Sequence, residues 1–119
     1  MATDVYDFEV LLSPIYASLV DKKLASNSVY DATNTDILRD GENLGNLILE
    51  VSELLNSKLA NPDTVQAEYN NLVSYATELT QNYSGKQPDT NSLEKLMEYL
   101  KSYLGILKES HKNELTGIL

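Results

Sequence analysis

The candidate catalytic side chains of this 119-residue chain are mainly carboxylates and hydroxyls, and there is one imidazole. The absence of cysteine excludes disulfides, thiolate nucleophiles and thiolate metal sites. The sequence has no Gly-x-Ser-x-Gly elbow, no P-loop and no dinucleotide-binding glycine pattern. A di-iron bundle site needs two Glu-x-x-His pairs, and His111 is the single histidine. His111 continues an apolar helical seam, so we expect it to pack at a helix end rather than to bind a metal.

One pair of glutamates has a spacing used in metal-dependent enzymes. The segment Glu50-Val51-Ser52-Glu53-Leu54-Leu55 is similar to the first Glu-x-x-Glu of the all-α nucleotide pyrophosphohydrolases of the MazG and dUTPase type. The resemblance implies an Mg²⁺ site completed by a Glu-x-x-Asp on a following helix. The best match to that second half is Glu68-Tyr69-Asn70-Asn71, where asparagine takes the place of aspartate. Because Mg²⁺ needs hard oxygen ligands from both pairs, the alternative is that these glutamates form a solvated helix face.

One polar segment has the length of a calcium-binding EF-hand loop. The twelve residues from Asp31 to Glu42 have acids at both ends, as an EF-hand loop does. Its sixth position is Asp36 instead of glycine, and its third and fifth positions are Thr33 and Thr35. We therefore expect a polar interhelical loop here, and no metal or other cofactor in this protein.

Helical periodicity is clearest in the second half of the chain. Asn61 and Pro62 predict an N-cap followed by proline at the first helical position, and Gly85 predicts the end of that helix. Apolar residues alternate at spacings of four and three between these points: Val65, Tyr69, Leu72, Ala76, Leu79 and Tyr83.

The next segment repeats this punctuation. Asn91 and Glu94 predict a capping box. The same alternation follows in Leu93, Met97, Leu100, Leu104 and Leu107. The short connection around Lys86 and Gln87 predicts that the two helices form an antiparallel hairpin.

The first half of the chain is expected to contain two more helices. A helix over about 35–60 has Gly41 and Gly45 near its start, so either it begins near Asn43 or a neighbour packs closely against the glycines. A helix near the N-terminus contains Pro14, which either kinks it or starts a new helix after a separate turn over 4–12. A long polar connection spans about 25–35. We predict an all-α fold, an antiparallel bundle of about four helices in a single domain over 1–119.

The charge disfavours nucleic acid as a direct ligand. Nine basic residues face eighteen acidic ones, for a net charge of -9, whereas nucleic-acid binding depends on Lys and Arg. The N-terminus has no basic or apolar segment typical of a secretory signal, and the longest apolar run, Leu47-Ile48-Leu49, is far below the ~20 residues of a membrane span. We therefore expect a soluble, cytoplasmic protein that is not inserted in a membrane. The low arginine content is typical of AT-rich genomes, such as those of low-GC bacteria and their phages.

The fourth predicted helix is apolar around more than half of its circumference. Leu96, Tyr99, Tyr103 and Ile106 form a second stripe, rotated from its main seam by roughly 80–100° at ~100° per residue. Such a helix is either central in its bundle, covered by a second copy in a dimer, or covered by a partner protein. We predict these four residues as the candidate partner-binding site, because half-buried tyrosines are common in interfaces.

These observations predict a non-enzymatic helical bundle that acts through protein–protein interaction, as chaperones, immunity proteins and phage accessory or inhibitor proteins do. The first alternative is the Mg²⁺-dependent pyrophosphohydrolase. A homo-oligomeric structural component is another. A further alternative is an acidic mimic of nucleic acid, whose centres would be two groups of acids: Asp4, Asp7 and Glu9, and Asp31, Asp36, Asp40 and Glu42.

Overall fold

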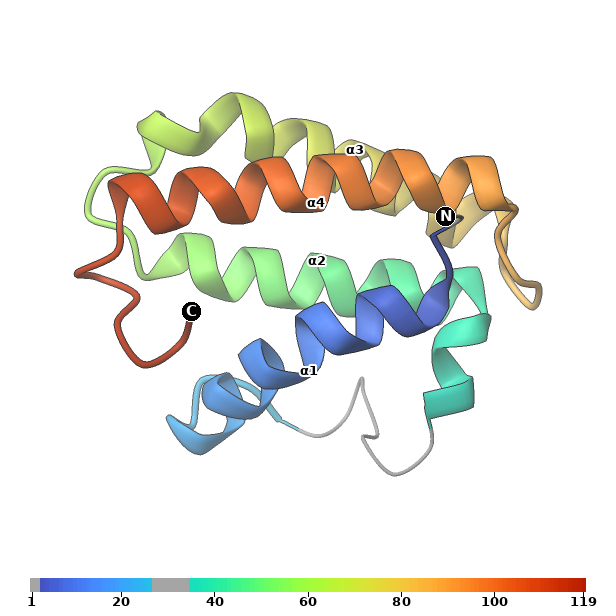
Figure 1. The fold of residues 1–119 in the computed structure, drawn as a ribbon, viewed down its shortest axis with the longest axis horizontal. Coiled ribbons are helices and arrows are strands. Elements are labelled where there is room, and N and C mark those ends of the chain that lie inside the picture. Colours follow the sequence, from blue (N-terminus) through green and yellow to red (C-terminus); the bar gives the residue numbers. More distant parts are fainter. Residues whose placement is uncertain (1–2, 27–34) are drawn as a thin grey trace.

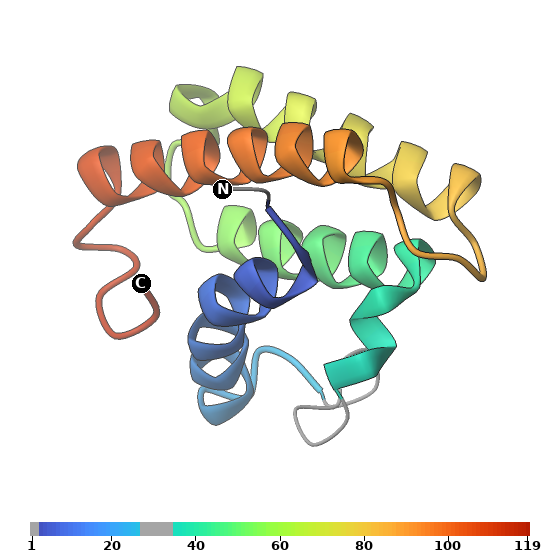
Figure 2. The same cartoon turned by 45° about the vertical axis from the view of Figure 1, so that its right-hand side comes forward.

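The computed structural model describes residues 3–26 and 35–119, and in them it contains four α-helices, two short 3-10 helices and no strand. In chain order the elements are α1 (Val5–Asp21), η1 (Thr35–Arg39), α2 (Gly41–Ser57), η2 (Pro62–Val65), α3 (Gln66–Asn82) and α4 (Thr90–Ser110). Helix α3 runs antiparallel to both α2 and α4, which run in the same direction as each other, and α1 crosses obliquely beneath α2 (Figures 1 and 2). The predicted all-α antiparallel bundle and its α3–α4 hairpin are confirmed.

Helix α1 is continuous through Pro14. It begins with a reciprocal capping box, in which the Asp4 carboxylate accepts from the Asp7 backbone N–H and the Asp7 carboxylate accepts from the Asp4 N–H. Pro14 cannot donate to the carbonyl one turn earlier, but its ring is exposed, and the opposite face of the helix is anchored in the core. That burial holds the helix together across the missing hydrogen bond. The alternative of a separate turn over 4–12 is therefore wrong.

Helix α2 starts at Gly41 because Asp40 caps it, its carboxylate accepting from the Glu42 N–H at 2.8 Å. The residues before it form η1, so the predicted start at 35 is wrong. A neighbour does pack closely against the glycines: a Cβ at Gly45 would lie 2.6 Å from Thr80 Cγ2 and 2.7 Å from the Ala76 carbonyl oxygen. The two glycines allow the backbones of α2 and α3 to approach each other.

Two of the predicted helix starts are corrected. The Asn61 side chain makes no capping hydrogen bond, and the residues from Pro62 form the 3-10 turn η2 before α3 begins. Asp89 rather than Asn91 is the N-cap of α4, since its carboxylate accepts from the Ser92 N–H at 2.7 Å. This hydrogen bond lowers the pKa of Asp89, as expected for a carboxylate at a helix N-terminus.

Some expectations fall outside the described residues. The polar connection over about 25–35, and the Asp31 end of the window considered for calcium, lie mostly or wholly within 27–34. Within the described ranges, no helix has both the length and the apolar character that a membrane crossing requires.

Candidate partner-binding groove

The two tyrosines of the stripe predicted on α4 pack against α3 within the same chain. Leu96 and Tyr103 are fully buried, whereas Tyr99 and Ile106 are partly buried against the core. The Tyr103 ring lies 5.8 Å from the ring of Tyr69 on α3, and the Tyr99 ring contacts another tyrosine of α3 at 5.6 Å. Helix α4 is apolar over a wide arc because it packs on its neighbours in the bundle. Leu96 and Tyr103 could reach a partner only if the core opened.

Tyr103 has a specific place in this core. Its hydroxyl lies 3.0 Å from both the Ser52 carbonyl oxygen and Asn56 Oδ1 on α2, and it donates to these acceptors. Burial raises the pKa of Tyr103 well above its usual range, with a further contribution from Tyr69. A buried hydroxyl with partners ties α4 to α2 without the cost of an unsatisfied polar group.

The carboxylates of the candidate magnesium site are not brought together. In the residues that the structure describes, no group of three or more histidine, aspartate or glutamate side chains is placed to hold a metal ion. Glu50 lies about 140° around α2 from Gly45, which contacts α3, taking ~100° per residue. Glu68 is on α3. Glu68, in the segment that resembles the second motif, therefore does not form a metal site with Glu50. Instead, Glu50 Oε2 is buried without a hydrogen-bond partner, and desolvation raises the pKa of Glu50.

His111 forms the C-cap of α4 and is buried, as expected for a helix-end residue. Its Nε2 is hydrogen-bonded to Thr64 Oγ1, and its Nδ1 lies 2.9 Å from Glu114 Oε2. The other carboxylate oxygen of Glu114 accepts from the Ala60 N–H at 3.2 Å. These hydrogen bonds anchor the residues after α4 to the connection between α2 and α3. None of the four residues lines the hollows described below.

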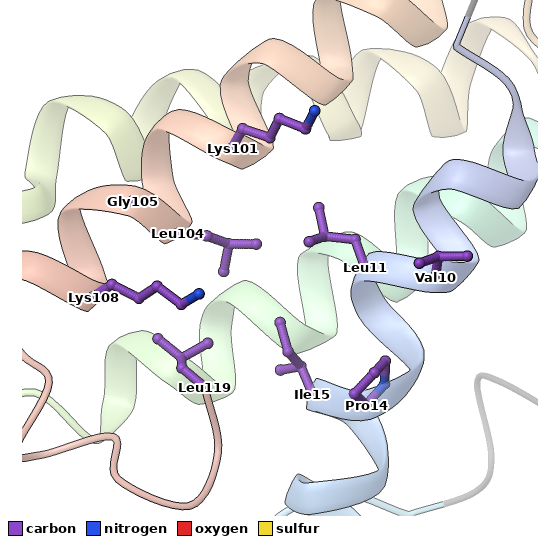
Figure 3. Close-up of a pocket in the computed structure, with 9 residues that line it drawn as sticks. All are labelled: Val10, Leu11, Pro14, Ile15, Lys101, Leu104, Gly105, Lys108 and Leu119. Atoms are coloured by element: carbon purple, nitrogen blue, oxygen red, sulfur yellow. The ribbon is translucent and has the colours of Figure 1, made fainter.

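An apolar hollow lies between α1 and α4. Helix α1 packs mainly on α2 and η1, which leaves a space of about 420 Å³ beside α4. Leu11 and Leu104 point toward each other across it, and Leu119 approaches one end (Figure 3). The full lining is Val10, Leu11, Pro14, Ile15, Lys101, Leu104, Gly105, Lys108 and Leu119.

Two further hollows extend this space into a groove. One, of about 360 Å³, shares Lys108 and Leu119 with the central hollow and reaches Lys112. The other, of about 770 Å³, shares Val10, Leu11 and Lys101 and reaches Asp4, Asp7 and Met97. From Met97 to Lys108 the wall on α4 is roughly 16 Å long, at ~1.5 Å per residue. We call the three hollows together the α1–α4 groove.

The groove has a basic side. Lys101, Lys108 and Lys112 line its α4 wall and its C-terminal end, and the first two lie on one side of the helix, seven residues apart. In residues 3–26 and 35–119, none of these three lysines forms an ion pair. Val10, at the rim, is 57% exposed although it is a large apolar residue. The groove can therefore take an elongated molecule with an apolar face and an acidic edge.

The groove was not predicted from the sequence. Its lysines look like an ordinary solvated helix face, and only tertiary packing shows that they lie across from α1. One available signal was the apolar tail after α4: Leu115 and Ile118 are buried, and Leu119 contacts the core. The other was Val10, an apolar residue on the exposed side of α1.

No protein-family model, curated protein or solved structure matches this chain.

Proposed function

We propose that this chain is a non-enzymatic protein-binding domain and that the α1–α4 groove is its docking surface. The observation that carries the proposal is the exposed apolar rim at Val10, next to a hollow lined by Leu11, Leu104 and Leu119. Water in contact with such a surface is released when a partner covers it, which favours association. Partner binding of the chaperone, immunity or inhibitor kind would use this groove. The residues of the stripe predicted on α4 would support this groove by packing α4 against the core.

Site-specific photo-crosslinking tests the proposal. A benzophenone amino acid is placed at Val10 and, as a matched control, at Ser74, which is exposed on α3 away from the groove. In cells of the native host we expect position 10 to capture a defined heterologous protein that position 74 does not capture. The substitution Val10→Glu places a charge at the exposed rim beside Leu11. It should abolish this interaction in pull-downs, whereas Ser74→Glu should not.

Three results would contradict the proposal. Equal capture at both positions would show that the groove is not selective. Crosslinks only between copies of this chain, with a dimer in light scattering, would favour the homo-oligomeric alternative. Mg²⁺-dependent nucleotide hydrolysis that is lost in Glu50→Gln would show an enzyme instead of a binding domain.

A further inference from the structure

We infer that the α1–α4 groove takes an amphipathic helix that carries acidic side chains along its edge facing α4. This inference rests on the proposed function and specifies the chemistry of the partner. It follows from the shape of the groove, from its unpaired lysines and from its exposure to water.

The shape of the groove suits a helix. Its α4 wall extends for roughly 16 Å, which corresponds to about eleven residues or three turns of helix. Leucine side chains at spacings of three and four on a partner helix would enter the central hollow between Leu11 and Leu104, as helices do in other apolar grooves. Leu119 closes the side of this hollow near the C-terminus.

The lysines favour acidic partner side chains along the part of the groove from Lys101 to Lys112, whereas Asp4 and Asp7 line the hollow at its other end. Lys101, Lys108 and Lys112 are three of only nine basic residues in a chain of net charge -9. Exposed lysines that lack an internal partner can pair with acids on a docked helix. Lys101 and Lys108 are two turns apart, about 10 Å along the axis, so acids at positions i and i+7 of a parallel or antiparallel partner would reach both.

The exposure of the groove disfavours a fatty acid or another small amphiphile. Ligand pockets usually bury about 70–90% of a small molecule. Here the rim residue Val10 is 57% exposed, so an acyl chain would remain largely in contact with water. A helix needs to bury only one face, and its polar face stays solvated.

A displayed peptide library tests the inference. Each 14-residue helical peptide has leucine fixed at spacings of three and four, and its flanking positions are randomised among Glu, Lys, Gln and Ser. The library is selected against the wild-type protein and against K101E/K108E. The control is K58E/K95E, which has the same change in net charge at exposed lysines outside the groove. Circular dichroism checks that all variants remain folded.

We expect wild type and K58E/K95E to enrich glutamate on one flank and K101E/K108E to enrich lysine there. A selected acidic peptide should bind K101E/K108E about 10-fold more weakly than wild type, since two exposed ion pairs become repulsions. Its affinity for wild type should also fall as salt increases, and Val10→Glu should remove binding.

The inference is overturned if glutamate enrichment is unchanged by K101E/K108E, or if no peptide binds in a manner sensitive to Val10→Glu. It is also overturned if a dansylated fatty acid binds the wild-type protein with one-to-one stoichiometry, does not bind the Val10→Glu variant, and is not displaced by any selected peptide. Protein capture at position 10 without charge preference in the library would refute this inference while leaving the proposed function intact. Failure of both the crosslinking and the library would refute both.

Discussion

The close approach of α2 and α3 predicts that one substitution will have opposite effects at two glycines. Alanine favours a helix over glycine by up to ~1 kcal/mol. At Gly105, on the exposed face of α4, an added Cβ has no atom within 4 Å. Gly105→Ala should therefore stabilise the protein by about 0.5–1 kcal/mol. At Gly45 the same methyl would lie 2.6 Å from Thr80 Cγ2 and 2.7 Å from the Ala76 carbonyl oxygen.

The contact with Ala76 involves backbone, so α2 and α3 must separate to relieve it. Overpacking of this kind costs about 1–3 kcal/mol, which exceeds the gain in helix propensity. We expect Gly45→Ala to lower the free energy of unfolding by about 1–2 kcal/mol. The two variants should then differ by about 1.5–3 kcal/mol, or roughly 5–15 °C in Tm for a domain of this size.

Urea denaturation followed by far-UV circular dichroism measures both variants against wild type, with equal m-values as a check that the unfolded states are comparable. If Gly45→Ala is as stable as Gly105→Ala, the two helices do not approach as closely as described. The reason given for the glycine at position 45 would then be wrong.

Two further predictions concern buried polar groups. Tyr103→Phe removes the hydroxyl that donates to α2 and should destabilise the protein by about 1–2 kcal/mol. Tyr99→Phe, on the same helix, should change stability by less than about 0.5 kcal/mol; equal effects in thermal melts would refute the assignment. Glu50→Gln removes a carboxylate with a buried, unpartnered oxygen. Because folding raises the pKa of Glu50, its ionisation opposes folding above the ordinary pKa and not below it. The variant should be more stable than wild type at pH 7, and this gain should fade toward about pH 4; a gain independent of pH in urea titrations would contradict the mechanism.

The local pattern determined the fold class and most of the helices. Four-three spacing of apolar residues such as Leu72, Leu79, Leu93 and Leu100 predicts a buried stripe whatever the stripe packs against, because it depends only on helix geometry. The sequence allowed two explanations for Gly41 and Gly45: a helix that begins near Asn43, or a neighbour that packs closely against the glycines. Helix capping was less certain, since Asp89 and Asn91 are both suitable caps and the choice between them depends on the path of the connection before α4.

The site could not be read from the sequence. A wide apolar arc on α4 is the same whether a neighbouring helix or a partner covers it, and the stripe containing Tyr103 is covered by α3. Lys101 and Lys108 line a groove only because α1, distant in sequence, crosses α2 obliquely and leaves Val10 and Leu11 beside α4. The sequence alone determined which faces of each helix are apolar. Tertiary packing decided which of those faces remain open, because burial depends on contacts between segments that are far apart in the chain.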